Sequence, residues 1–288
     1  MPRALIAGCG YLGRALADLL VGKSWEIEGW TVSAESALEL SRNGHRAQQV
    51  DISSKENVVA RKAAFDAVIH CASTRGGDEK LYRRVYWAGV KNLIECFGET
   101  RVLFVSSTSV YAQTCGELVT EESVAEPKPE TGRVLREAEQ LVLASHGVVA
   151  RLGGIYGPGR SALLRRFLDG RATLDPDNDR FVNQIHRDDA AAAISILLQA
   201  ATSAGQIYNV VDNEPKLLSD CYRWLATALN RPLPPPGGST SKRKRGDSNK
   251  RVSNAKLRSI DWVPRYPTFA VGMEKSVLQG LGAQLRAT

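Results

Sequence analysis

Three glycines near the amino terminus have the spacing of a dinucleotide-binding motif. Gly8, Gly10 and Gly13 form a Gly-x-Gly-x-x-Gly pattern between an apolar run, Arg3–Ala7, and a segment with helical periodicity, Leu12–Val21. The first glycine permits a tight turn, the second lets the backbone approach a pyrophosphate, and the third allows close packing of helix on strand. The N–H groups at the start of the helix would bind the diphosphate. The motif predicts a nicotinamide dinucleotide; a glycine turn without a ligand is the alternative.

The end of the second expected strand selects between NAD and NADP. NAD enzymes usually place a carboxylate there to bind the ribose 2′-hydroxyl. This chain has Thr31 and Ser33 at that place, and no carboxylate to repel a 2′-phosphate. Their hydroxyls could donate to the phosphate, and Arg14 or Arg42 could add charge. We therefore favour NADP over NAD.

Strand-like and helix-like segments alternate through the first half of the chain. Strands are expected at Arg3–Ala7, Trp25–Val32, Ala47–Ile52, Ala67–Cys71, Val102–Ser106 and Val148–Leu152, and helices at Leu12–Val21, Leu81–Phe97 and Arg133–Ala144. Continuous apolar strands are typical of a sheet that is covered on both faces. The alternation predicts an α/β fold with a Rossmann-like, doubly wound parallel sheet.

The second half follows a looser pattern, which predicts a smaller lobe. Its expected elements are a helix at Asp188–Ala200 capped by Asp188, a strand at Ile207–Val211, a helix at Ser219–Leu229 and a linker at Pro232–Gly238. We expect an NAD(P)-binding Rossmann domain over residues 1–152 and a smaller mixed α/β substrate lobe over residues 153–288. Residues 183–213 are expected to return to the Rossmann domain.

The composition is typical of a soluble globular protein. Hydrophobic residues make up 43% and charged residues 24% of the chain, and no apolar stretch is long enough for a membrane span. The five cysteines are scattered, which predicts reduced thiols and no metal site. No signal-peptide pattern precedes the first strand, so we expect a cytoplasmic protein.

The net charge of +7 comes from one stretch, Thr240–Arg258, which carries eight cations and one acid. Three interpretations stay open: a solvated loop, a subsite for an anionic substrate such as a phosphate or nucleotide-sugar, and a nucleic-acid contact. Proteins that follow nucleic acid usually spread their charge over a face, so nucleic acid is the least favoured partner.

Further motifs follow in a fixed order along the chain. They are Asp51-Ile52, Asp66–Ala72, Val105–Tyr111, Arg151–Arg160 and Ile185–Asp189. With the glycine motif, they resemble the extended short-chain dehydrogenase/reductase family, in which the NAD-dependent epimerases and dehydratases fall. The chain is most similar to an atypical bacterial branch of that family. The resemblance implies a Rossmann fold, a nicotinamide cofactor and a small-molecule substrate.

The resemblance breaks at the residues that move the proton. Where the family carries Tyr-x-x-x-Lys, this chain has Thr131 and, four positions later, Leu135. General acid–base catalysis of this kind is worth about 10²–10⁴ in rate, and an aliphatic alcohol is too weak an acid to replace a phenol. Arg133 stays protonated and cannot act as a base. The motifs thus predict the cofactor site and leave the reaction open.

The resemblance implies roles for residues along the whole cofactor. The expected cofactor contacts are Gly8, Gly10, Tyr11, Leu12, Gly13, Thr31, Ser33, Asp51, Ile52, Cys71, Ala72, Ser73 and Tyr156. For Asp51, a simple helix cap is the alternative. Ser107 falls on the family's catalytic Ser/Thr, and His186 is the expected proton carrier because imidazole titrates near neutral pH. Tyr111 and, less favoured, Tyr86 are further candidates; a packed structural side chain is the alternative for each.

Two functions are consistent with these residues. The first is an NADP-binding enzyme that reduces, epimerises or dehydrates a small polar substrate, such as a sugar or nucleotide-sugar, in a pocket lined by Asn183 and His186. The second is a non-catalytic NADPH-binding sensor or partner-binding module, which the missing tyrosine and lysine motivate. A homodimer paired through the helices at Leu81–Phe97 and Arg133–Ala144 is an open alternative to a monomer.

Overall fold

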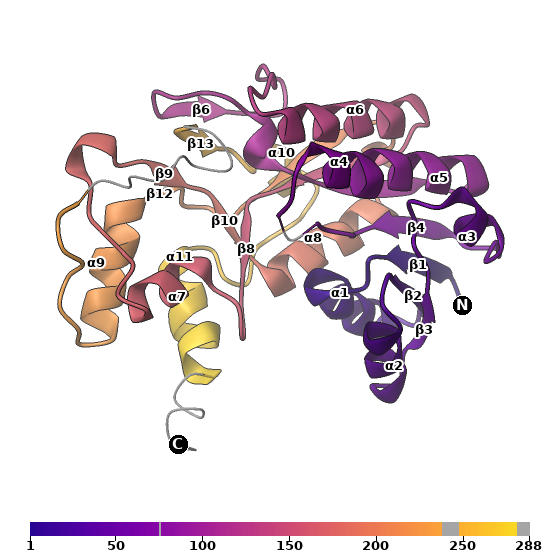
Figure 1. The fold of residues 1–288 in the computed structure, drawn as a ribbon, viewed down its shortest axis with the longest axis horizontal. Helices are drawn as coiled ribbons and strands as arrows, with labels where there is room; N and C mark the ends of the chain where they lie inside the picture. Colours follow the sequence, from indigo (N-terminus) through magenta and orange to yellow (C-terminus); the bar gives the residue numbers. More distant parts are fainter. Residues whose placement is uncertain (75, 238–247, 281–288) are drawn as a thin grey trace.

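A seven-stranded parallel sheet forms the centre of the molecule. The computed structural model describes residues 1–74, 76–237 and 248–280. Every pairing in the sheet is parallel, in the order β11-β7-β5-β4-β1-β2-β3 (Figure 1). The strands are β1 (Arg3–Ala7), β2 (Glu26–Thr31), β3 (Arg46–Gln49), β4 (Ala67–His70), β5 (Val102–Ser107), β7 (Val148–Leu152) and β11 (Ile207–Val210). This architecture confirms the predicted Rossmann-like, doubly wound α/β fold.

Helices cover both faces of the sheet, because successive side chains of a strand point to opposite sides. In β1, Ala4 and Ile6 pack into one apolar cluster, and Leu5 and Ala7 pack into another. The first face carries α1 (Tyr11–Val21), α2 (Ala34–Arg42) and α8 (Arg187–Gln199), and the second carries α3 (Lys55–Val59), α5 (Gly89–Cys96) and α6 (Glu130–Ala144).

The long helix expected at Leu81–Phe97 contains an irregular turn. It consists of α4 (Glu79–Tyr82), a π-helical turn (Arg83–Ala88) and α5. The carbonyl oxygen of Val85 in this turn lies 2.9 Å from Nε2 of His70, the last residue of β4. Such turns often accompany functional sites, and this one lies beside the carboxyl end of a central strand.

The rest of the chain builds a lobe beside the sheet. Among the described residues, its two-stranded sheets pair β8 (Gly154–Tyr156) with β10 (Gln184–His186), β9 (Phe181–Val182) with β12 (Lys216–Leu217), and β6 (Glu117–Val119) with β13 (Lys250–Val252). The helices α7 (Ala162–Leu168), α9 (Leu218–Ala228) and α11 (Phe269–Gly272) surround an apolar cluster of their own. Helix α8 packs on α1, and β11 pairs with β7, so this segment of the chain lies in the Rossmann layers.

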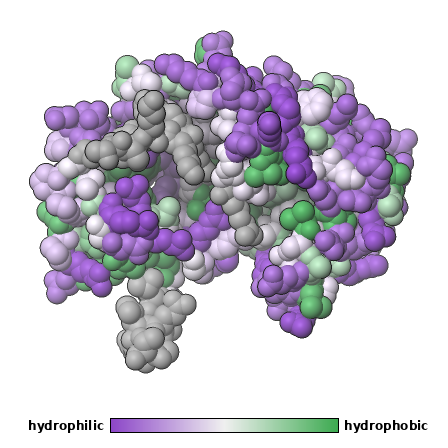
Figure 2. Space-filling model, viewed as in Figure 1, coloured by the Kyte–Doolittle hydropathy of each residue, from purple (hydrophilic) through white to green (hydrophobic). Residues whose placement is uncertain are grey.

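Polar and charged side chains cover most of the face shown in Figure 2. None of the helices in the described ranges is long and apolar enough to cross a membrane. Of the basic stretch, Lys242–Arg245 lie outside the described residues, as does Gly238 of the expected linker. Lys250 and Arg251 are described and belong to β13.

Candidate cofactor and active site

The glycine motif forms the turn between β1 and α1. Gly8 has a φ of +90°, and a Cβ there would lie 2.2 Å from the backbone of Ala72. A Cβ on Gly13 would lie 3.0 Å from the carbonyl oxygen of Gly8 and 3.0 Å from Cγ2 of Ile6, so α1 packs closely on β1. A Cβ on Gly10 would meet nothing nearer than 4.0 Å. The turn therefore requires Gly8 and Gly13, and Gly10 leaves the start of α1 uncrowded, which makes it the candidate site for a diphosphate.

The segment after β4 borders this turn. The N–H of Cys71 donates to the carbonyl oxygen of Ala7 at 2.7 Å, which places Ala72 and Ser73 at the same edge of the sheet. Burial raises the pKa of Cys9 to about 12, and it raises the pKa of the Cys71 thiol as well. Both thiols therefore stay protonated and act as small packing groups rather than nucleophiles.

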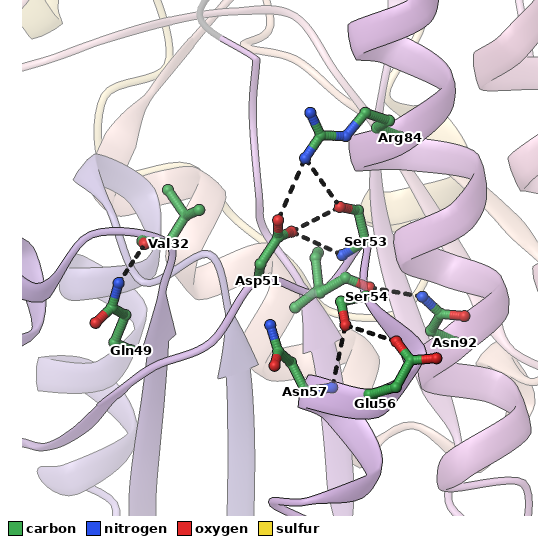
Figure 3. A network of polar contacts seen from close by, with 10 residues as sticks. Val32, Gln49, Asp51, Ser53, Ser54, Glu56, Asn57, Arg84 and Asn92 are labelled. Carbon is green, nitrogen blue, oxygen red and sulfur yellow. Dashed lines mark hydrogen bonds and ion pairs between the residues drawn. The ribbon is translucent and has the colours of Figure 1, made fainter.

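A cavity of about 310 Å³ lies beyond the ends of β2 and β3 and is lined by Val32, Gln49, Asp51, Asn57, Ala60 and Arg61. Figure 3 shows how its carboxylate is held. Oδ1 of Asp51 accepts the N–H of Ser53 at 2.9 Å and its hydroxyl at 2.7 Å, and Oδ2 accepts from Arg84 at 3.3 Å. Ser54, rather than Asp51, caps α3. This cavity is the candidate site for the adenosine end of the cofactor, since ligands of open α/β sheets bind at the carboxyl ends of the strands.

Sequence analysis missed Gln49, Asn57 and Arg61. The signal that was available is their position directly after the strand that follows the expected 2′-phosphate residues. Arg61 matters most, because it is a cation that lines the cavity.

The hydroxyls of Thr31 and Ser33 already have partners in the chain. The hydroxyl of Thr31 donates to the carbonyl oxygen of Ser33 at 3.0 Å. The side chain of Ser33 caps α2: its oxygen accepts the N–H of Ser36 at 3.2 Å, and its hydroxyl lies 2.9 Å from that of Ser36. Val32, which lies between them, lines the cavity, and the hydroxyls of Thr31 and Ser33 can reach a phosphate only as additional contacts.

The two arginines that the sequence offered for a 2′-phosphate are not placed to bind one. Both terminal nitrogens of Arg14 pair with Glu39, each at 2.6 Å. Arg42 lies in the last turn of α2, whereas β2 leads into the first turn. Neither Arg14 nor Arg42 is among the residues that line the cavity, whereas Arg61 lines it and is the candidate for the charge.

Tyr11, the residue after Gly10, joins the glycine turn to the lobe. Its ring lies between two guanidinium groups, 5.1 Å from that of Arg160 and 5.0 Å from that of Arg187. Its hydroxyl donates to the carbonyl oxygen of Pro158 at 3.1 Å. The side chain thus faces the lobe, and only the backbone of Tyr11 and Leu12 is left to face a diphosphate.

The side chain of Tyr156, a residue expected to contact the cofactor, is enclosed in the lobe, which leaves its backbone for such a contact. The side chain is 1% exposed and packs among the apolar residues of the lobe. Its hydroxyl lies 3.4 Å from the carbonyl oxygen of Thr268. A Cβ on Gly272 would come within 2.1 Å of that hydroxyl, so the lobe closes tightly around Tyr156.

Ser107 ends β5 at the carboxyl edge of the sheet and is partly exposed. Its side-chain oxygen accepts the N–H of Ser109 at 3.2 Å, which keeps the hydroxyl hydrogen available to a ligand. Thr131 and Leu135 lie on α6, where the family places its tyrosine and lysine. Leu135 is 4% exposed and packs in an apolar cluster, so Ser107 stands there without the family's acid–base pair.

Tyr111 is a buried structural residue rather than a proton carrier. It has no exposed surface. Its hydroxyl donates to Oδ1 of Asn209 at 2.9 Å and accepts from Arg151 at 2.8 Å. Burial also raises the pKa of Tyr111. The phenol therefore both donates and accepts a hydrogen bond inside the chain, and Tyr111 is not placed to carry a proton for a substrate.

His186 is likewise sealed inside the protein. It has no exposed surface, and its Nδ1 accepts the N–H of Asp188 at 3.2 Å, so His186 and not Asp188 caps α8. Nε2 must then carry the hydrogen and donates to the hydroxyl of Ser276 at 3.0 Å. The ring of Tyr266 lies 3.9 Å away. Burial lowers the pKa of His186 to about 4, and a neutral, enclosed imidazole is a poor proton carrier.

Replacing His186 by asparagine, another capping residue, should leave NADPH binding unchanged, lower stability because a buried ring is lost, and change how stability depends on pH. The folded-state pKa of His186 is lowered to about 4 from 6.5, so the unfolded chain binds the extra proton between these values. His186 therefore costs stability as the pH falls from about 6.5 to 4. The stability of the wild type relative to His186→Asn, from urea titrations at about pH 7 and pH 4.5, should decrease toward the acid side. A pH-independent difference would contradict this assignment.

Comparisons with known proteins agree with this fold. A model of the NAD dependent epimerase/dehydratase family matches residues 4–210. The chain is 31% identical over 222 residues to Protein YeeZ of Escherichia coli, covering 73% of this chain and 77% of that one. It is 26% identical to 4-hydroxy-2-methyl-3-oxo-4-farnesyl-3,4-dihydroquinoline-1-oxide ketoreductase of Stigmatella aurantiaca, covering 75% and 69%. A solved structure of an NAD-dependent epimerase/dehydratase from Methylobacillus flagellatus superposes with a TM-score of 0.75 at 29% identity, over 99% and 98% of the two chains.

Proposed function

This chain belongs to the NAD-dependent epimerase/dehydratase family, and we propose that it is an NADP(H)-dependent reductase that acts on a carbonyl group of a small polar, sugar-like substrate. The observation that carries the proposal is the uncrowded start of α1 at Gly10, which lies at the same carboxyl edge of the parallel sheet as the cavity beside Asp51. The similarity to a ketoreductase favours reduction over epimerisation and dehydration.

The chain's own groups then have distinct tasks. The backbone N–H groups at the start of α1 hold the diphosphate, and Arg61 pairs with the 2′-phosphate. The hydroxyl of Ser107 donates to the substrate oxygen and orients it. When bound, the reduced cofactor supplies the hydride that the protein itself cannot provide.

A non-catalytic NADPH-binding module is the second candidate. It is favoured by the enclosure of His186 and Tyr111, which removes two proton carriers in addition to the family's tyrosine and lysine. Oxidation of bound NADPH by a panel of aldehydes, ketones and keto-sugars separates the two, because a module would bind NADPH tightly and turn over none of them.

Replacing Arg61 by alanine should weaken NADPH binding about 10-fold and leave NADH binding unchanged, because only NADPH carries the 2′-phosphate that the guanidinium would bind. Tryptophan-to-nicotinamide energy transfer in titrations with both cofactors measures this. Arg42→Ala, which removes an arginine from the far end of α2, is the matched control and should change neither affinity.

Each result has a separate meaning. A wild type that binds NADH as tightly as NADPH would remove the NADP preference and keep the dinucleotide site. Equal losses for both cofactors in Arg61→Ala would show that Arg61 acts on the fold or the adenine. No binding of either cofactor would refute the proposed function.

A further inference from the structure

Lys250, in β13 of the lobe, is a buried ammonium group with cationic surroundings. It is 5% exposed. Its Nζ donates to the carbonyl oxygen of Tyr111 at 2.9 Å and to the hydroxyl of Ser248 at 3.1 Å. Within the described ranges, the charged side chain that acts on it is another cation, Arg180. An ammonium group has three N–H donors, and the two acceptors that bind it among the described residues are both neutral.

The strand that carries Lys250 is fixed to the segment that lines the expected substrate pocket. Asn183 binds β13 through both side-chain atoms: Nδ2 donates to the carbonyl oxygen of Lys250 at 3.0 Å, and Oδ1 accepts the N–H of Val252 at 2.7 Å. These paired bonds set the register of β13 and therefore the position of the ammonium.

Lys250 also reaches the neighbourhood in which the family lysine is missing. Leu135, at that lysine's position on α6, packs in one apolar cluster with Tyr111 and with Val252 of β13. Lys250 and Val252 are alternate residues of one strand and are both buried, so they face the same side. Tyr111, to which the ammonium binds, follows Ser107 by one short helical turn, Thr108–Val110. Figure 1 shows β13 and β6 beside α6.

We propose that Lys250 supplies from the lobe the proton-donating ammonium that α6 lacks. This inference rests on the proposed reductase function. The substrate carbonyl carbon accepts a hydride from the reduced nicotinamide, its π electron pair moves to the oxygen held by Ser107, and the N–H bond of Lys250 gives its proton to that oxygen. The products are the alcohol, the oxidised nicotinamide and a neutral lysine amine, which water reprotonates.

The surroundings of Lys250 suit this task. Burial, with a smaller contribution from Arg180, lowers the pKa of Lys250 to about 8. At neutral pH the group is protonated and able to donate, and it regains its proton readily afterwards, as efficient acid catalysis requires. Burying a charge costs stability, and a buried ammonium with a lowered pKa is more typical of functional sites than of packing. Lys250 is bound to the carbonyl oxygen of Tyr111, four residues after Ser107.

The test that needs no substrate is NMR titration of ¹³C-ε-labelled lysines in the NADPH and NADP⁺ complexes of the full chain, with Lys250→Met assigning the signal. A nicotinamide beside Lys250 should give it a pKa about one unit lower with NADP⁺ than with NADPH, because only the oxidised ring is cationic. Lys216, which pairs with Glu214 at 3.0 Å, is the control and should titrate alike in both complexes.

Equal pKa values for Lys250 in the two complexes, or an ordinary value of about 10.4, would overturn the inference while nucleotide binding still supports the proposed function. Absence of nucleotide binding would refute both.

Turnover of a carbonyl found in the substrate panel gives a second readout. Lys250→Met should lower kcat about 10²–10⁴-fold with KM and NADPH affinity unchanged. Lys250→Arg keeps the charge but cannot release a proton, so it should be as slow as Lys250→Met. Since removing an uncompensated buried charge relieves strain, the methionine variant should melt no lower than the wild type. Full activity in the arginine variant would show that Lys250 acts through its charge and not as a proton donor. Full activity in the methionine variant would show that Lys250 has no part in the reaction.

Discussion

Replacing Glu139 by alanine should lower the free energy of unfolding by about 3–5 kcal/mol. Glu139 has no exposed surface. It accepts hydrogen bonds from Arg151, at 3.0 Å from Nε and 2.7 Å from Nη2, and from the hydroxyl of Ser106 at 2.6 Å. Arg136 also pairs with it. Arg151 is itself 1% exposed. The substitution therefore leaves a guanidinium buried without its carboxylate, which is far more costly than losing an exposed ion pair.

Glu137 offers a matched control on the same helix. It pairs with Arg83 at 2.7 Å, but both side chains are 42% exposed, so Glu137→Ala should cost less than about 1 kcal/mol. Urea denaturation of the two variants measures the difference. If Glu139→Ala were as mild as Glu137→Ala, water would have to reach Arg151, and the structural role given to Tyr111 would be weakened with it.

This network also explains why Tyr111 could not be assigned from the sequence. A tyrosine four residues after Ser107 has the right chemistry for proton transfer, and no local pattern tells which way its ring points. The direction is decided by partners distant in sequence, Arg151 and Asn209, which lie on β7 and β11. The same holds for His186, whose partner Ser276 lies near the carboxyl end of the described chain.

The fold was predictable to a much greater degree than the site. Strands β1, β4, β5 and β7 are mostly apolar because both faces of the sheet are covered, and such segments stand out in the sequence. The glycine turn was equally predictable, since Gly8 and Gly13 are required by contacts within the same βα unit. Constraints of this kind act between residues that are close in sequence, so a sequence pattern reveals them.

Residues brought in from other segments were not predictable in this way. Arg61 lies after the short helix α3 and has no periodic pattern around it, yet it lines the cavity at the end of β2. Lys250 belongs to a basic stretch whose composition suggests a solvated loop, but the pairing of β13 with β6 buries it. Charge alone does not distinguish a buried lysine from an exposed one; the parallel pairing of two short strands does.

The second large effect concerns the family lysine itself. Leu135→Lys, which would restore half of the missing pair, should lower the free energy of unfolding by about 3–5 kcal/mol and restore no activity. Leu135 is 4% exposed and packs in an apolar cluster with Phe104, Val110 and Ala138, and no member of that cluster is an anion. A lysine there loses its hydration without compensation, whereas the ammonium of Lys250 has the carbonyl of Tyr111 and the hydroxyl of Ser248.

Leu118→Lys is the matched control, because the same exchange on β6 falls at a side chain that is 61% exposed and should change stability by less than about 0.5 kcal/mol. Thermal and urea unfolding of both variants, with NADPH oxidation by the substrate panel, measures the two expectations. A stable Leu135→Lys variant with higher turnover would mean that α6 still forms the proton-donor site and that Lys250 is not needed. A destabilised, inactive variant would mean that the apolar packing around Leu135 excludes an ammonium from α6. The proton donor would then have to lie on another element, which is the role proposed for Lys250 on β13.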